Sequence, residues 1–318
     1  MMKAAAWILL QVALASATLD LQRSQIVTQE TRIHLELSHT RRAQTEVSYW
    51  QARKRAQKER DALPESAFTT PNTDLGEFRR IWDFYTPDYN CPLLKERVGR
   101  LGDGGKWVCG MRALLEDRPC MIYSLGSAGD ISFESELLNR TSCEVHTFDP
   151  TLSQETEETM LAALPDLHFH AVGIGRGGGG APDESLNDKG FYGIEQVMGA
   201  LSHEWLDVLK IDIENHEWDV FGDFYATPGA RLPATQLLVE FHWPGNADRV
   251  WKVLDAILAD KFRIFSVEPN YYCEEGACAK NLLEFAFIKV SDDGHVCSPH
   301  SHSHNTGGNA AVLLPHGC

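Results

Sequence analysis

Short apolar runs alternate with amphipathic segments from residue 120 to residue 290. The apolar runs, rich in β-branched and aromatic residues, predict seven strands: Met121–Leu125, Glu144–Phe148, Leu167–Val172, Val208–Ile213, Gln236–Phe241, Phe262–Glu268 and Leu283–Val290. The segments between them predict helices at Ile131–Leu138, Glu155–Leu164, Ile194–Leu201, Glu217–Phe224 and Ala247–Ala259. Alternating strands and helices predict an α/β fold with a doubly wound, mostly parallel sheet.

The connection before the last strand differs from the others. Only Pro269 to Asn281 separates the last two strands, which is too short for the helix of a parallel crossover. We therefore expect the last strand to run antiparallel to its neighbours.

The N-terminal residues suggest export from the cytosol. A short start with Lys3, an apolar run and Ala15-Ser-Ala17 predict a signal peptide over residues 1–17. An uncleaved signal anchor, which would make a type II membrane protein of the Golgi or endoplasmic reticulum, is the alternative. The membrane is an expected partner only in that case.

Three further regions follow. Residues 18–76 are polar and predict an exposed helical stem and a linker, because Pro64, Pro71 and Gly76 mark its end. Residues 77–290 form the main domain, which we expect to begin with a helical preface. Residues 291–318 are rich in Gly, Ser and His and predict a disordered tail.

The net charge and the cysteine content indicate which partners and which cellular compartment to expect. The net charge of −16 repels phosphate backbones and excludes nucleic acid as an expected partner. Eight cysteines are typical of an oxidising compartment, and Asn139-Arg-Thr141 is an acceptor sequence for N-glycosylation. These features favour a secreted protein or one of the secretory-pathway lumen.

The cysteine spacing suggests disulfides. Cys120 lies six residues before Gly126, and Cys143 lies six residues before Asp149. If the two strands are adjacent and parallel in that register, the two cysteines come within disulfide distance. Cys273 can pair with Cys278 across a loop, and Cys91 with Cys109. The alternative in each case is a buried thiol.

A glycine turn follows the first strand of the main domain. Its spacing is Gly126-x-x-Gly129, with Ala128 inside it, whereas dinucleotide sites use G-x-G-x-x-G to approach a pyrophosphate. The turn therefore favours a nucleoside ligand without phosphates, such as adenosine with an amino-acid tail. Asp149, at the tip of the next strand, would accept hydrogen bonds from the ribose hydroxyls; a turn-initiating Asp before Pro150 is the alternative.

Two further strand tips carry groups able to do chemistry. Asp212 and Glu214 follow the fourth strand, where α/β sheets bind ligands; capping of the next helix is the alternative for Glu214. His216 and His242 are the histidines that we expect at strand tips, and either could be a general base. A purely structural histidine is the alternative for each.

Several motifs together resemble one family. They are Asp103-Gly-Gly-Lys-Trp-Val-Cys109, Tyr123-Ser-Leu-Gly-Ser-Ala-Gly-Asp130, Phe133-Glu134, Phe148-Asp-Pro150 and Leu209-Lys-Ile-Asp-Ile-Glu-x-x-Glu217-Trp218. Over about residues 79–290 the chain resembles the methyltransferase-like protein 24 group, which is related to FkbM-type methyltransferases. The resemblance implies a Rossmann-like, seven-stranded S-adenosylmethionine (SAM) methyltransferase sheet, and an unidentified acceptor, a sugar or a protein, methylated on oxygen.

The resemblance also assigns roles to residues. It implies SAM contacts from Ser124, Gly126, Ser127, Gly129, Asp130, Asp149, Val172 and Asp212. Asp212, Glu214, His216 and His242 are the catalytic candidates, and no metal is expected. The chain departs from the family pattern at Ala128 and Asn215, where glycine is usual.

Two other functions remain open from the sequence. One is a secreted binding module that keeps the fold without catalysis, favoured by Ala128 and opposed by the retained acids. The other is a nicotinamide-dependent oxidoreductase, disfavoured by the missing G-x-G-x-x-G. We predict a SAM-dependent methyltransferase of the secretory pathway.

Overall fold

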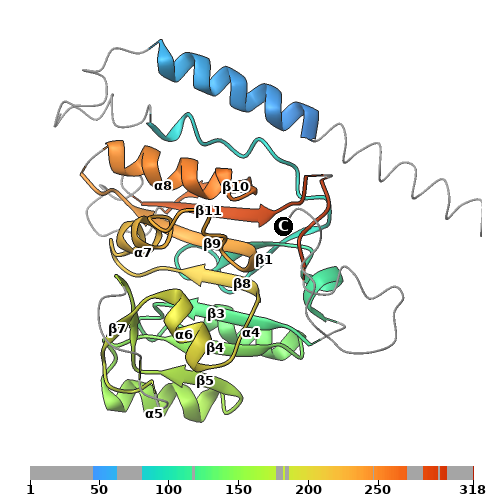
Figure 1. Ribbon diagram of the computed structural model, residues 1–318. Helices are drawn as coiled ribbons and strands as arrows, with labels where there is room; N and C mark the ends of the chain where they lie inside the picture. The colour runs from blue at the N-terminus through green and yellow to red at the C-terminus, as the bar shows by residue number, and fades with distance from the viewer. Residues whose placement is uncertain are drawn as a thin grey trace, which may run out of the picture. The chain divides into compact units, whose positions relative to one another are not determined.

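A seven-stranded sheet forms the centre of the domain (Figure 1). The computed structural model describes residues 46–62, 81–116, 119–176, 182, 186–245, 247–270, 282–292, 294–298 and 318. The strands lie in the order β10-β11-β9-β8-β3-β4-β5. They are β3 (Met121–Leu125), β4 (Glu144–Phe148), β5 (Leu167–His170), β8 (Leu206–Ile211), β9 (Ala234–His242), β10 (Phe262–Pro269) and β11 (Leu282–Lys289). All seven predicted strands are confirmed, with ends shifted by a few residues.

The direction of the last strand is also confirmed. β11 is antiparallel to both β10 and β9, whereas β9, β8, β3, β4 and β5 pair in parallel. Parallel strands place their carboxyl ends on one edge of the sheet, so the loops after β3, β4, β8 and β9 meet there.

Helices cover both faces of the sheet. They are α4 (Ser132–Arg140), α5 (Gln154–Ala163), α6 (Ile194–Ala200), α7 (Glu217–Phe224) and α8 (Ala247–Ala259), and the last two have the predicted bounds. Apolar side chains of α4 and α5 enter one core, and those of α6, α7 and α8 enter the other. Each helix thus buries one apolar face against the sheet, which excludes water from both sides of its strands.

The predicted helical preface is wrong for residues 95–109. β1 (Lys95–Val98) and β2 (Lys106–Cys109) form an antiparallel hairpin. The turn between them contains Gly99, Gly102 and Gly104 at positive φ, a conformation that favours glycine and ends a helix. A short π-helix (η1, Met111–Glu116) follows, and β6 (Gly173–Ile174) pairs in parallel with β7 (Phe191–Tyr192).

The predicted stem is helical over residues 48–61, but it is not an exposed spacer. Tyr49 is buried, Arg53 Nη1 donates a hydrogen bond of 2.8 Å to Phe84 O, and Arg60 forms an ion pair of 2.5 Å with Asp255 on α8. This helix therefore belongs to the main domain. Its apolar positions were too few for the sequence to show this.

Disulfides join distant parts of the chain. The predicted pairs Cys91–Cys109 and Cys120–Cys143 are confirmed, the second because β3 and β4 align Met121 with Glu144. An unpredicted disulfide joins Cys297 to Cys318. Cys273 and Cys278 lie outside the described residues.

The region predicted to be a disordered tail is ordered at its start. Val290 bridges to Val296, and Ser291, Cys297 and Ser298 are buried. Residues 1–17 lie outside the described part of the chain, so the signal peptide stays a prediction. Among the described residues no helix has the length and apolar character of a membrane span. Asn139, the predicted glycosylation site, is exposed on α4.

The Cys120–Cys143 disulfide is expected to stabilise the domain. It closes a loop with a sequence separation of 23 residues, and a loop of that size contributes about 3 kcal/mol by restricting the unfolded chain. Replacing both cysteines with serine should lower the free energy of unfolding by about that amount in urea titrations. Peptide mapping without reduction checks the pairing itself, and a free Cys120 would contradict it.

Candidate active site

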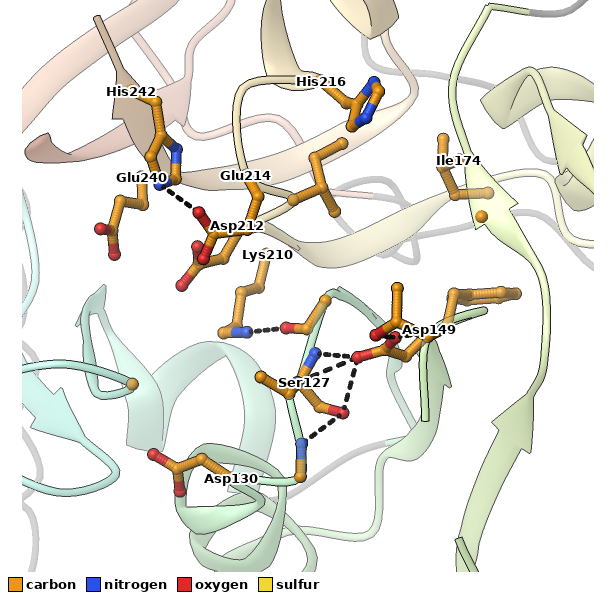
Figure 2. Close-up of a pocket in the computed structure, with 18 of the residues that line it drawn as sticks. Ser127, Asp130, Asp149, Ile174, Lys210, Asp212, Glu214, His216, Glu240 and His242 are labelled. Carbon is orange, nitrogen blue, oxygen red and sulfur yellow. Dashed lines mark hydrogen bonds and ion pairs between the residues drawn. The ribbon is translucent and has the colours of Figure 1, made fainter. Parts of the chain in front are cut away.

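A cavity of about 880 Å³ lies at the carboxyl edge of the sheet, a size typical of small-molecule sites. Figure 2 shows two walls: Ser127 and Asp149 on one side, and Asp212, Glu214, Glu240 and His242 on the other. Other lining residues come from the hairpin turn, from β6 and β7, and from the end of β10; among them are Arg100, Asp103, Gly104, Ile174, Phe191 and Asn270.

The carboxylate of Asp149 holds the glycine turn (Figure 2). Its Oδ2 accepts hydrogen bonds from the backbone N–H groups of Ser127 at 3.0 Å and Ala128 at 2.9 Å. Its Oδ1 accepts from the backbone and hydroxyl of Thr151 at 2.9 and 2.6 Å. Asp149 therefore organises the turn, a role that the sequence prediction did not contain.

These hydrogen bonds favour the charged form of Asp149. Burial alone would raise its pKa, but hydrogen bonds from Thr151, Ala128 and Ser127 outweigh burial and lower the pKa. Because the folded-state pKa is below the unfolded value, Asp149 stabilises the fold at neutral pH. That stability is lost as the pH falls through the folded-state pKa.

Gly126 allows the turn to approach the loop after β8. Its φ is +78°, and a Cβ there would lie 1.7 Å from the carbonyl oxygen of Asp212. Lys210 Nζ donates a hydrogen bond of 2.9 Å to Gly126 O. These contacts hold the carboxyl ends of β3 and β8 together, and the two ends form the floor of the cavity.

A buried cluster of charges lies beside this floor. Lys106 of β2 extends its ammonium to Glu284 Oε1 at 2.5 Å, Asp212 Oδ2 at 3.4 Å and Glu240 Oε2 at 3.5 Å. Asn270 Nδ2 donates to Glu240 Oε1 at 3.1 Å. The ammonium of Lys106 therefore faces three carboxyl groups, two from β9 and β11 and one from the residue after β8.

The cluster shifts the pKa values of its members in different directions. Burial would lower the pKa of Lys106, but the three acids outweigh burial and raise it. Burial, followed by the charges of Asp212 and Glu284, raises the pKa of Glu240 to about 10. Burial would raise the pKa of Asp212, but Lys106, Lys210 and His242 lower it. The cluster therefore favours the neutral form of Glu240 and the charged form of Asp212.

Replacing Lys106 with methionine should destabilise the fold by about 3–5 kcal/mol at pH 7, because it leaves buried carboxylates without their cation. The loss should shrink as the pH falls, since the acids then take up protons. Urea titrations at several pH values measure this. Arg249→Met, which removes a half-exposed ion pair with Asp219, is the matched control and should cost less than about 1 kcal/mol. Equal losses in the two variants would contradict the role of Lys106.

His242 is held between two glutamates. Its Nδ1 lies 3.1 Å from Oε1 of the fully buried Glu217, and its Nε2 lies 3.1 Å from Oε2 of Glu214, whose side chain is 84% exposed. Burial would lower the pKa of His242, but Glu217, Glu214 and Asp212 outweigh burial and raise it. A buried acid that orients a histidine at a cavity wall is an arrangement suited to proton transfer.

The loop after β8 is strained where it reaches the cavity. Glu214 and Asn215 have φ values of +54° and +77°, a region that non-glycine residues occupy at a cost of about 1–2 kcal/mol. The loop turns Glu214 toward His242 in this conformation. Asparagine tolerates it better than other non-glycine residues, which explains why Asn215 can stand where the related family usually has glycine.

Most of this chain is similar to a known protein family. Residues 48–289 match the model of a protein family described as a methyltransferase domain. The chain belongs to this family. The match starts in the helix of residues 48–61, in agreement with the packing of that helix on the domain.

Two curated relatives resemble this methyltransferase domain. Probable methyltransferase-like protein 24 of Homo sapiens is 28% identical over 164 residues, which are 48% of this chain and 43% of the relative. The Rattus norvegicus protein of the same name is 28% identical over 172 residues, or 49% of this chain and 45% of the relative. The chain thus spans less than half the length of these relatives.

Solved methyltransferase structures show weaker similarity. The fibrillarin pre-rRNA processing protein of Methanococcus jannaschii is 12% identical with a TM-score of 0.34, over 54% of this chain and 67% of its own. A Burkholderia thailandensis N1-methyltransferase with bound S-adenosylhomocysteine is 13% identical with a TM-score of 0.33, over 54% and 72%. Similarities with such low identities and TM-scores do not indicate the substrate of this domain.

SAM is the cofactor of this methyltransferase domain, and the cavity fits it. The glycine turn lines the cavity, and the charged Asp149 and Asp212 lie on its two walls. Six of the eight residues predicted to contact SAM line the cavity: Gly126, Ser127, Gly129, Asp130, Asp149 and Asp212.

The other two predicted contacts do not reach the cavity. Ser124 is fully buried and donates its hydroxyl hydrogen to Glu134 on α4. Val172 is fully buried in the core, and its neighbours Gly173 and Ile174 line the cavity in its place. Neither side chain is therefore among the residues that line the cavity.

All four catalytic candidates line the cavity, but they are not equivalent. Asp212, Glu214 and His242 form one group, whereas His216 lies apart near the Phe191 ring at 6.1 Å. Sequence reasoning missed Lys106, Lys210 and Glu240. Lys210 and Glu240 are charged residues inside apolar strands, and that pattern is the signal that could have identified them. Lys106 is the first residue of the short strand β2, and no local pattern marks it.

Proposed function

We propose that this protein transfers the methyl group of SAM to a hydroxyl oxygen of a sugar or protein acceptor in the secretory pathway. The observation that carries the oxygen assignment is the Glu217–His242 pair beside Asp212. A hydroxyl must lose its proton as it attacks, so transfer to oxygen needs a base at the cavity.

The two walls of the cavity would bind different parts of SAM. Asp149 would contact the ribose hydroxyls, and the turn from Gly126 to Gly129 would lie against the methionine part. Asp212, charged at pH 7, is available to the amino-acid or sulfonium end. When bound, SAM supplies an electrophilic methyl group on sulfur, so the protein's main contribution is to align it with the acceptor.

His242 would take the acceptor proton at Nε2. Glu217 fixes the ring through Nδ1 and stabilises the imidazolium that forms. Glu214, which contacts Nε2 and is mostly exposed, would move aside when an acceptor binds. The half-exposed Phe191, which lies near His216 in the cavity lining, would offer the acceptor an apolar surface.

The proposed compartment rests on separate observations. Residues 1–17 have the pattern of a signal sequence, and every described cysteine is in a disulfide. Disulfides of this kind persist in oxidising compartments and are rare in the cytosol.

An assay with isotopically labelled SAM tests the proposal. Secreted glycoproteins and free oligosaccharides serve as acceptors, and mass spectrometry locates the added methyl group. Label on a hydroxyl oxygen, lost in His242→Asn, is the expected result. Label on nitrogen or carbon would contradict the oxygen assignment, and a protein made without entering the secretory pathway would contradict the compartment.

A further inference from the structure

Histidines gather on one face of the sheet, outside the cavity. Glu144 and His146 alternate on β4, and His168 and His170 alternate on β5. The parallel register places His146 beside His168. Because alternate residues of a strand point to the same face, the four side chains share one face at the edge of the sheet.

Three of these side chains converge. His146 Nε2 lies 2.9 Å from Glu144 Oε1, and His168 Nε2 lies 4.0 Å from the same oxygen. The rings of His146 and His168 are stacked with centroids 4.7 Å apart and planes at 16°. One ligand atom from each residue lies within 4.8 Å of the other two.

Two other groups of potential metal ligands in the described residues have comparable spacing, but a lysine already lies beside both. They contain Glu240 with Asp212 and His242, or with Asp103 and Glu284. The ammonium of Lys106 lies 2.5 Å from Glu284 and 3.5 Å from Glu240. Lys106 thus supplies a positive charge to both of these groups. Among the described residues, no lysine or arginine forms an ion pair with the group of Glu144, His146 and His168.

His170 completes the arrangement. Its Nε2 lies 2.8 Å from Nδ1 of His146. If Nε2 of His146 faces a metal, Nδ1 carries the hydrogen and donates it to His170. Metal-binding histidines commonly have such a partner, which fixes the tautomer and the orientation of the ring.

We propose that Glu144, His146 and His168 bind a divalent transition-metal ion of the zinc class. Two imidazoles and one carboxylate form a ligand set typical of zinc. Zinc bonds of about 2.0–2.1 Å in a tetrahedron separate ligand atoms by roughly 3.3 Å. The rings of His146 and His168 are nearly parallel, so the half-exposed His168 must turn to aim its Nε2 at the same ion. The side chains of Glu144 and His168 are 48% and 52% exposed, which leaves the ion access and an open fourth position.

The site lies apart from the cofactor cavity but touches its wall. The ring of His170 stacks on Phe148 with centroids 4.7 Å apart, and Phe148 lines the cavity. A bound ion would join the edge strand β5 to β4. The site does not depend on the proposed methyl transfer.

Calorimetry with Zn²⁺ on the full-length, chelator-stripped protein tests the proposal. We expect one tight site per chain and a rise in Tm of at least about 5 °C at Zn²⁺ one hundredfold above its Kd. His168→Asn and Glu144→Gln should each weaken zinc binding at least tenfold. Both side chains are half exposed, so the metal-free variants should unfold at the same temperature as the metal-free wild type.

The matched control replaces His300, His302 and His304 with asparagine, because alternating histidines can also bind zinc. This variant should keep the tight site. X-ray absorption should find only nitrogen and oxygen ligands at about 2.0–2.2 Å. No stoichiometric binding by the wild type, wild-type affinity in His168→Asn, or loss of the site in the control would each overturn the proposal.

Discussion

Replacing Asp149 with asparagine is expected to weaken SAM binding at least about 100-fold, which corresponds to about 2.7 kcal/mol. In either orientation the amide turns its N–H donors toward groups that now donate to the carboxylate, either the backbone N–H groups of Ser127 and Ala128 or the N–H and hydroxyl of Thr151. Each buried donor left without an acceptor costs about 1–3 kcal/mol. The glycine turn should therefore lose its fixed shape, and the proposed ribose acceptor is lost with it. Isothermal titration calorimetry measures the effect.

Thr151→Val is the matched control for Asp149. It removes the hydroxyl that donates to Oδ1 but leaves both backbone bonds to the turn. We expect SAM affinity to fall less than about tenfold in this variant. Unchanged SAM affinity in Asp149→Asn, in a protein that remains folded by circular dichroism, would refute the role of Asp149.

Replacing His242 with asparagine should lower kcat by about 10²–10⁴, the usual contribution of a general base, while the Kd for SAM changes little. His216→Asn distinguishes the two candidate bases. His216 has no described contact with a carboxylate, so its replacement should reduce kcat less than about tenfold. A larger loss in His216→Asn than in His242→Asn would reverse the assignment.

The pH profile separates catalysis by His242 from a structural role. Only the neutral imidazole accepts a proton, and the glutamates raise the pKa of His242. Activity should therefore rise with pH, with a midpoint above the usual histidine value of about 6.5. Glu217→Gln keeps a hydrogen-bond acceptor but removes the buried charge, so it should move the midpoint to lower pH. A midpoint that does not move would contradict coupling between Glu217 and His242.

The positions of the seven main strands along the chain followed from the sequence because each strand is a separate apolar run. The short Pro269–Asn281 connection was enough to reverse β11. The hairpin of β1 and β2 was missed because its strands are four residues long and rich in charge. Such strands become recognisable only through their partners in the fold.

The site was predictable where strand ends carry it and unpredictable where distant segments complete it. The tips of β3, β4 and β8 indicated Gly126, Asp149 and Asp212, since parallel strands end at one edge. Lys106 reaches the same site from a separate hairpin, at sequence separations of more than 100 residues. No local pattern encodes that distance.

The two departures from the family pattern share one physical feature. Ala128 and Asn215 have φ values of +47° and +77°, which explains the usual glycine at both positions. In Ala128 the hydrogen bond from its N–H to Asp149 offsets the steric cost. The departures are therefore compatible with the cofactor cavity and do not by themselves indicate a loss of function.

Titration of the folded protein with SAM, S-adenosylhomocysteine and NAD tests the central claim most directly. The cavity with its glycine turn and charged Asp149 predicts one site per chain that binds both SAM and S-adenosylhomocysteine, and no binding of NAD. The same titration of Asp149→Asn should show the loss of that site. A folded wild-type protein that binds neither SAM nor S-adenosylhomocysteine would contradict the account.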